Sequence, residues 1–167
     1  MKLQLFLSLV TVLTWPVNCE NRCPQYWVDA TDFKMGCLWF NFKTSMNWEN
    51  AQEYCRTINI TVTKQSHLVE IYSMEQQHFL ERKFIEFDFI YGIVHDWWTG
   101  LTDDLFEGRW LWSFSLLPAN YTFWYTGRPI QDNRYNYVVI RSGYEYTWYD
   151  NSGSSSYYPI CQFLPDE

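Results

Sequence analysis

The side chains best suited to chemistry in this sequence are five cysteines, three histidines and a few neighbouring acids. His67, His78 and His95 lack the spacing of a metal-binding motif, and no nucleophile elbow, phosphate-binding loop or dinucleotide fingerprint is present. Asp103 and Asp104 could act as general acid and base, but carboxylates are common in loops. The sequence therefore argues against an enzyme and leaves disulfide formation as the main chemistry.

The N-terminus has the composition of a signal peptide. Lys2 precedes an apolar run from Leu3 to Thr14, which is shorter than the roughly 20 residues that span a bilayer as a helix. We expect cleavage after Cys19, which gives a signal peptide at 1–19 and one domain at 20–167. A retained signal anchor is the alternative. No other stretch is apolar enough to cross a membrane, so we expect a secreted, extracellular protein.

Cleavage would leave an even set of cysteines, namely Cys23, Cys37, Cys55 and Cys161. In an exported chain such a set implies two disulfides, with three possible connectivities. Loss of Lys2 takes the formal net charge from −7 to −8, and this acidic balance excludes nucleic acid as a natural partner. Asn-x-Thr sequons predict glycosylation at Asn59 and Asn120.

The elements that must position these residues fall into two groups. One helix is predicted after the N-cap Asn47, and a second begins at Ser73, where the sequence has a capping-box pattern. Short β-prone segments then alternate with turn signals, at residues 97–101, 109–113, 137–141, 146–149 and 157–163. Two helices followed by antiparallel strands predict a single domain of the α+β class.

Short motifs follow one another in a distinctive order along the chain. They are Cys23-Pro24, Trp48-x-x-Ala51-x-x-x-Cys55, His67-Leu68-Val69-Glu70-Ile71, Trp98-Thr99-Gly100-Leu101, Glu107-Gly108-Arg109-Trp110, Gly127-x-Pro129, Trp148-Tyr149-Asp150 and Pro159-Ile160-Cys161. In this order and spacing they resemble the C-type lectin domain, from Cys23 to the C-terminus. The resemblance implies a C-type lectin-like fold of two helices, antiparallel sheets and long surface loops.

The resemblance also implies which cysteines pair. The two expected disulfides are Cys23–Cys37 and Cys55–Cys161. Most family members have a further long-loop bridge, whose positions hold Tyr137 and Gly153 here. Because both cysteines of that bridge are missing, no orphan thiol remains, and we expect more mobile upper loops. Pro129 takes the place of the family's cis proline. The expected core residues are Trp98, Gly100, Leu101, Trp110, Trp112, Val138 and Ile140, with His67 also packed.

The sugar-binding calcium site of the family departs strongly from its usual pattern. Calcium takes six to eight oxygen ligands, which the family supplies from a triplet around the proline, a later Glu and a Trp-Asn-Asp element. Here the triplet is Arg128-Pro129-Ile130, the Glu position holds Tyr135, and only Asp150 remains among the side-chain ligands. Because a guanidinium repels a divalent cation, we expect no calcium ion at this position.

A second, auxiliary calcium site is less clearly altered. Asp103 and Glu107 match two of its carboxylates. Further oxygen-bearing side chains fall at or near it, namely Gln131, Asp132, Asn133 and Asn136. With Asp150, the two matched acids are weak candidate calcium ligands. The alternative, which we favour, is that they are solvated loop acids, so no cofactor is expected.

Recognition without calcium could use other side chains of the same loops. Arg128 could pair with an acidic group, and Tyr125, Tyr135 and Tyr149 could stack on a sugar or anchor a protein. Alternatively, the tyrosines fill the space of the missing bridge, and Arg128 neutralises Asp132 or Asp150.

These observations predict a secreted lectin-like binding protein that recognises a glycan or an extracellular protein surface, and not an enzyme. One alternative is a calcium-dependent lectin with a site rearranged around Asp103, Glu107, Asp132 and Asp150. Another is a non-lectin use of the fold, as in toxin-like, antifreeze or coat proteins.

Overall fold

The computed structural model describes residues 22–58 and 65–165, so the predicted signal peptide and the sequon at Asn59 lie outside the described residues. The elements in chain order are β1 (Val28–Ala30), η1 (Thr31–Phe33), β2 (Gly36–Phe40), α1 (Trp48–Thr57), β3 (His67–Leu68), α2 (Met74–Tyr91), β4 (Trp97–Thr102), β5 (Leu111–Trp112), β6 (Tyr137–Arg141), η2 (Ser142–Tyr144), β7 (Thr147–Asn151) and β8 (Tyr158–Phe163). The predicted α+β class is confirmed.

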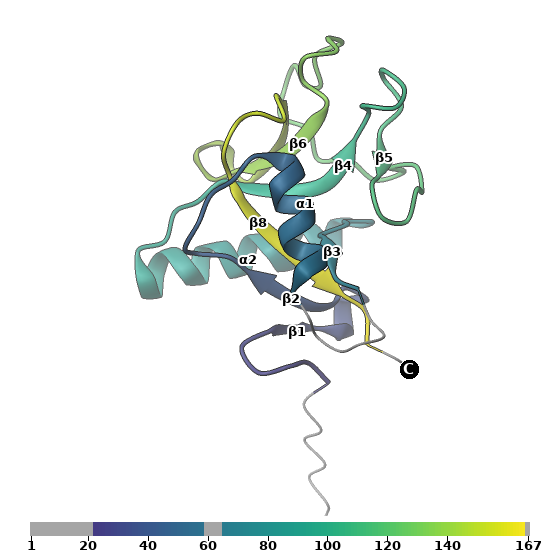
Figure 1. Cartoon of the computed structure of the whole chain (residues 1–167). Helices are drawn as coiled ribbons and strands as arrows, with labels where there is room; N and C mark the ends of the chain where they lie inside the picture. Colours follow the sequence, from purple (N-terminus) through teal and green to yellow (C-terminus); the bar gives the residue numbers. More distant parts are fainter. Residues whose placement is uncertain (1–21, 59–64, 166–167) are drawn as a thin grey trace, which may run out of the picture.

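The strands form one sheet in the order β1-β2-β8-β4-β6-β7, with β3 added to β8 and β5 added to β4. Their pairings are antiparallel, except that β4 and β8 run parallel. In Figure 1, β1 and β2 lie near the C-terminus, whereas the long loops around β5 and β6 lie at the opposite end. The strand β8 therefore connects the end formed by β1 and β2 to the end that carries the loops.

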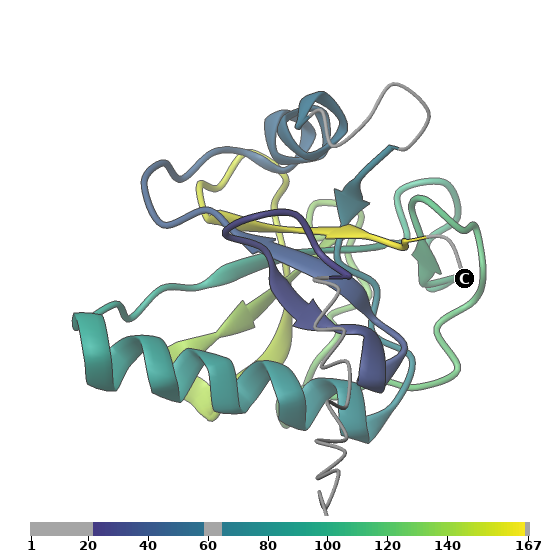
Figure 2. The ribbon, with the colours of Figure 1, turned by 90° about the horizontal axis from the view of Figure 1, so that it is seen from below.

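Both helices begin where the sequence predicts. The Asn47 side chain accepts a hydrogen bond from the Asn50 backbone N–H at 2.9 Å, and the Ser73 hydroxyl accepts one from the Gln76 N–H. The reciprocal bond of the capping box is shifted by one residue, since the Gln76 side chain accepts from the Tyr72 N–H. Figure 2 shows the two helices on opposite sides of the central strands.

The core is divided between these two sides. Along β4, Trp97 packs in the larger cluster with the α2 residues Phe84 and Phe87, whereas Trp98 packs with Trp48 on the α1 side. This alternation follows the two-residue period of a strand and explains why both faces of β4 are apolar. The expected core residues are buried apart from Trp110. Trp110 is half-buried because it lies at the edge of the core, where it packs against the Trp124 ring.

Both disulfides are paired as the resemblance implies. Cys23–Cys37 staples the β1–β2 hairpin across a sequence separation of 14, and Cys55–Cys161 joins α1 to β8 across a separation of 106. In the chain-entropy account the longer closure stabilises the fold by about 4–5 kcal/mol and the shorter one by about 3 kcal/mol. The longer bridge also fixes the end of α1 against the central strand.

Four of the five predicted strands have different limits, two of them by one residue at one end and the other two for local backbone reasons. The strand expected at 146–149 begins at Thr147, because Glu145 and Tyr146 have left-handed φ angles of 55° and 56°. The strand expected at 109–113 is reduced to Leu111–Trp112, since the Arg109 N–H closes a turn onto the Phe106 carbonyl. The short strand β3 and the hairpin strands β1 and β2 carry too few alternating residues to stand out in the sequence.

Candidate ligand-binding site

Arg128 and Asp150 meet at the position expected for the sugar-binding calcium ion. Arg128 lies in the long loop before β6, next to Pro129, whose peptide bond is cis, and Asp150 lies on β7. The guanidinium Nη1 of Arg128 is 3.0 Å from Asp150 Oδ1, and the Ile130 backbone N–H donates to Asp150 Oδ2 at 2.7 Å. Both oxygens of this fully buried carboxylate are therefore engaged by donors from the loop.

This arrangement does not fit a calcium ion bound through Asp150. The carboxylate already has a cation and an N–H donor as neighbours, and the loop that would supply further oxygens supplies donors instead. Of the two neutralising roles considered for Arg128, the structure shows the one with Asp150. The other is wrong, because Asp132 pairs with Arg134. Hydrogen bonds from Arg134 hold the pKa of Asp132 at about 2.

An aromatic cluster lies beside Arg128. Its guanidinium carbon lies 4.8 Å from the centre of the Tyr149 ring, and Tyr149 packs against both Tyr125 and Tyr144, with ring centres 4.9 Å from each. The Tyr125 and Tyr144 rings also contact each other, with centres 5.3 Å apart. Tyr149 is only 7% exposed, so the expectation that it offers a free stacking surface is wrong. Tyr125 and Tyr144 are 40% and 41% exposed and form the accessible part of the cluster. We call Tyr125, Arg128, Tyr144 and Tyr149 the Arg128 cluster.

The other loop candidates lie outside this cluster. Gln131 and Asn133 are exposed, and the Gln131 amide lies against Gly108. Tyr135 is half-buried, with the Arg134 guanidinium 5.7 Å from its ring centre. The sequence did not single out Tyr144, because it follows β6 in a short 3-10 turn whose place next to Tyr149 depends on the β6–β7 pairing.

Asp103 holds a distinctive position at the auxiliary site. Its carboxylate is 3% exposed, and Oδ2 accepts a hydrogen bond from the Gly108 N–H at 2.8 Å. Its Oδ1 and the Oδ1 of Asn136 are both buried without a hydrogen-bond partner among the described residues. Burial, together with the charges of Glu107 and Asp150, raises the pKa of Asp103 above its ordinary value.

These two oxygens have the chemistry of calcium ligands, but the rest of a coordination shell is not assembled around them. Glu107 is exposed. Within residues 22–58 and 65–165, no three or more His, Cys, Asp or Glu side chains gather where they could hold a metal ion. Two of the four acids of the rearranged site are also already paired with an arginine, namely Asp132 and Asp150. Asp103 and Asn136 fit as partial ligands only.

The positions of the missing long-loop bridge are filled by a direct contact. The Tyr137 ring lies on Gly153 so closely that a β-carbon placed on Gly153 would be 2.6 Å from Tyr137 Cε2. The ring also packs on Trp48, with ring centres 4.5 Å apart. An aromatic side chain at position 137 and a glycine at position 153 thus take the place of two cysteines.

Comparison with known proteins agrees with this architecture. The family model of the lectin C-type domain matches residues 44–163. The chain belongs to the C-type lectin domain family. It is 30% identical over 161 residues to a C-type lectin mannose-binding isoform of Oxyuranus scutellatus, with 93% of each chain covered. A crystal structure of the C-type lectin CEL-I from Cucumaria echinata superimposes with a TM-score of 0.72 at 27% identity, covering 87% of this chain and 100% of that one.

The C-type lectin domain also matches part of larger proteins. It is 34% identical over 90 residues to C-type lectin domain family 10 member A of Mus musculus, and it spans only 23% of that protein's length. Members of this family are binding domains rather than enzymes. No helix in the described part of the chain is long and apolar enough to cross a membrane. The two disulfides fit an oxidising compartment.

Proposed function

We propose that this C-type lectin domain is a secreted binding protein that recognises a glycan or an extracellular protein surface through its long loops, without a sugar-binding calcium ion. The observation that carries the proposal is the 3.0 Å ion pair between Arg128 and the buried Asp150. Two unit charges about 4 Å apart interact by roughly 4 kcal/mol at an effective dielectric of 20, and a divalent ion doubles that repulsion. Calcium would have to displace Arg128 before it could bind Asp150.

The Arg128 cluster offers a replacement for calcium-mediated contacts. A guanidinium carries five N–H donors, and the described bonds to Asp150 use those of Nη1. The Arg128 side chain is 25% exposed and lies on the Tyr149 ring, which packs against the partly exposed Tyr125 and Tyr144. A carboxylate, sulfate or hydroxyl pair on the target would accept hydrogen bonds from arginine, while an apolar sugar face or side chain packs on the tyrosines.

The direct test compares binding in calcium and in EDTA. The protein is applied to a glycan array and a panel of extracellular proteins, and we expect the same targets at the same strength in both buffers. Substitution Arg128→Lys keeps the charge beside Asp150 but loses the planar fork, so binding should fall at least ten-fold with little change in melting temperature. Arg56→Gln, at the exposed end of α1, is the control. Complete loss of binding in EDTA contradicts the proposal.

A second candidate is a calcium-dependent lectin with a rearranged site. The buried Asp103 Oδ1 favours it, since this oxygen has no hydrogen-bond partner among the described residues and calcium binds carboxylate oxygens. Isothermal titration with calcium distinguishes the two candidates. Heat that disappears in Asp103→Asn supports the second candidate, whereas no heat and no rise in melting temperature rejects it.

Export, glycosylation and the lack of catalysis belong to the same proposal. The predicted signal peptide at 1–19, the paired cysteines and the sequons at Asn59 and Asn120 support a secreted glycoprotein, and Asn120 is exposed as an acceptor must be. Sequencing the N-terminus of the secreted protein tests cleavage after Cys19. A mass decrease on enzymatic removal of N-glycans tests the sequons.

A further inference from the structure

Two neighbouring hollows lie next to the start of α1, one beside the loops that flank β5 and the other beside the loops that precede β6 and follow β7. The first has a volume of about 180 Å³ and mostly apolar walls, and the second has a volume of about 360 Å³ and mostly polar walls. Asp104 and Tyr137 line both hollows, so we take the two together as one groove. We call this the acidic groove and define it by Trp48, Glu49, Asp104, Leu105, Leu116 and Tyr137. None of the residues of the Arg128 cluster lines it.

We propose that the acidic groove binds the basic side chain, arginine or lysine, of a protein partner. In this arrangement the aliphatic stem of that side chain would lie on the apolar walls and its charged end would lie between Asp104 and Glu49. This proposal does not depend on the Arg128 cluster, so an experiment can refute either binding site without refuting the other.

The apolar wall is held in place rather than being a loose loop. Leu105 and Leu116 are 67% and 64% exposed, although each lines the groove. The loop that carries Leu116 is fixed by the buried Glu70 carboxylate. Its Oε1 accepts hydrogen bonds from the Phe114 and Ser115 N–H groups at 3.2 and 3.0 Å. Leu116 itself has a left-handed φ of 60° and donates its N–H to the Trp112 carbonyl. Because a bulky residue rarely adopts this conformation, the surrounding structure must hold the Leu116 backbone in place.

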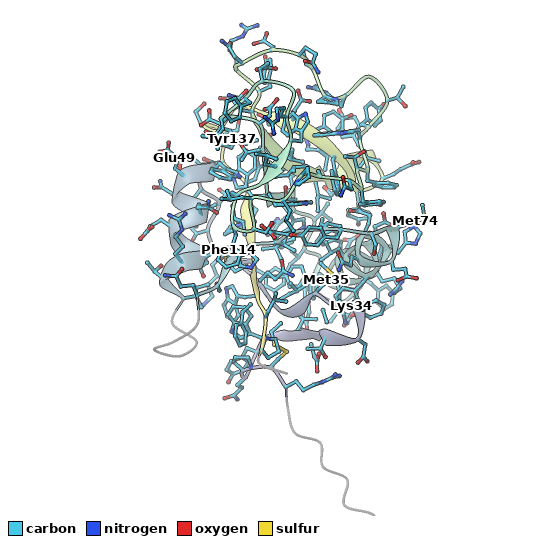
Figure 3. The ribbon with its side chains drawn as sticks, turned by 90° about the vertical axis from the view of Figure 1, so that its right-hand side faces the viewer. Lys34, Met35, Glu49, Met74, Phe114 and Tyr137 are labelled. Carbon is cyan, nitrogen blue, oxygen red and sulfur yellow. A yellow bond between two sulfur atoms is a disulfide. The ribbon has the colours of Figure 1, made fainter. Side chains whose placement is uncertain are left out.

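The acidic rim lies around Tyr137. Figure 3 shows Glu49 and Tyr137 at the same edge of the molecule. Burial, together with the carboxylates of Asp104 and Glu49, raises the pKa of Tyr137 to about 12. The cation that lines the polar hollow is Arg134, which is paired with Asp132. The rim therefore presents negative charge next to an apolar wall, and the net charge of −7 adds a longer-range attraction for a basic partner.

An acidic rim next to an apolar wall favours a basic side chain as the ligand of this groove. Lysine and arginine side chains bury their methylene stems on apolar surface while the charged end stays near water or an acid, which matches the order of surfaces along the groove. A sugar would leave most of its hydroxyl groups against apolar walls without partners, at a cost in free energy. An anionic lipid surface would be repelled by the rim.

The test uses a pair of ligands that differ only in charge. Acetyl-leucyl-arginine amide is titrated into the ¹⁵N-labelled protein, and acetyl-leucyl-citrulline amide is the neutral counterpart of the same shape. We expect the arginine peptide to shift the indole N–H resonance of Trp48, which donates to the Thr99 carbonyl at 2.9 Å, and the backbone resonances of Leu105 and Leu116. The citrulline peptide should bind at least three-fold more weakly. Added salt should reduce this difference.

Matched variants locate the site. Asp104→Asn and Glu49→Gln should each weaken binding of the arginine peptide by roughly two- to five-fold, the range for exposed charge pairs. Glu53→Gln removes the same charge from another exposed position of α1 that does not line the groove, and it should leave binding unchanged. The proposal would be overturned if both peptides bound equally, or if Glu53→Gln weakened binding as much as the groove variants do. It would also be overturned if no groove resonance shifted at about 20 mM peptide, a concentration well above a millimolar dissociation constant.

Discussion

Gly153 provides the sharpest test of how the long loops are held without their usual bridge. A β-carbon at this position would lie 2.6 and 2.8 Å from Cε2 and Cδ2 of Tyr137, whereas carbon atoms in ordinary contact are about 3.5–4.0 Å apart. The ring cannot move away freely, because it packs on Trp48. Gly153→Ala should therefore destabilise the protein by about 1–3 kcal/mol, the usual cost of overpacking.

The assay is urea denaturation of four proteins, which are the wild type, Gly153→Ala, Tyr137→Ala and the double variant. Tyr137→Ala removes the ring that the new methyl group would strike, so in that background Gly153→Ala should cost less than about 0.5 kcal/mol, leaving a coupling energy of at least 0.5 kcal/mol. Gly143→Ala is the matched control, since a β-carbon there would meet no atom within 4 Å. The same cost of Gly153→Ala in both backgrounds, or no cost in the wild type, would refute the proposed contact.

Two further predictions concern buried titratable groups. Asp103→Asn should raise the melting temperature by about 2–4 °C at neutral pH without calcium, because the raised pKa of Asp103 means that its ionised form opposes folding; unchanged or lower stability would contradict this. His67 is 4% exposed, stacks on Phe114 with ring centres 3.9 Å apart, and has a pKa lowered by burial. Neutral His67 therefore supports folding above about pH 6.5, and this support is lost as the pH falls through its folded value. In urea titrations across this range, His67→Phe should lose less stability on acidification than the wild type, and parallel curves would argue against the assignment.

The fold follows closely from sequence features that act locally or covalently. Asn47 and Ser73 mark the helix starts because their side chains bond to the backbone N–H three residues later. The cysteine pairing could be inferred only from the family resemblance, since four cysteines alone allow three connectivities. Tyr146 shows where local reasoning fails, because a β-prone residue here takes a left-handed backbone angle and the strand starts only at Thr147.

The candidate sites were harder to predict because they combine distant segments. The sequence identified Arg128 and Asp150, but their partnership depends on a loop that brings residues 22 positions apart within 3.0 Å. Of the two interpretations of Tyr149, packing rather than stacking on a ligand is the one that its burial against Tyr125 and Tyr144 supports. The acidic groove was missed altogether, because Trp48, Leu105 and Leu116 lie on three separate segments and no periodicity links them.

The contact between Tyr137 and Gly153 changes how this molecule responds to its chemical surroundings. A ring resting on a backbone carries no sulfur, so thiols in the medium have nothing to cleave there. Among the described residues, the covalent links lie at the β1–β2 hairpin and at the end of α1. A brief exposure to reductant should therefore act at the β1–β2 hairpin and at the end of α1, and not directly on the contact that replaces the long-loop bridge.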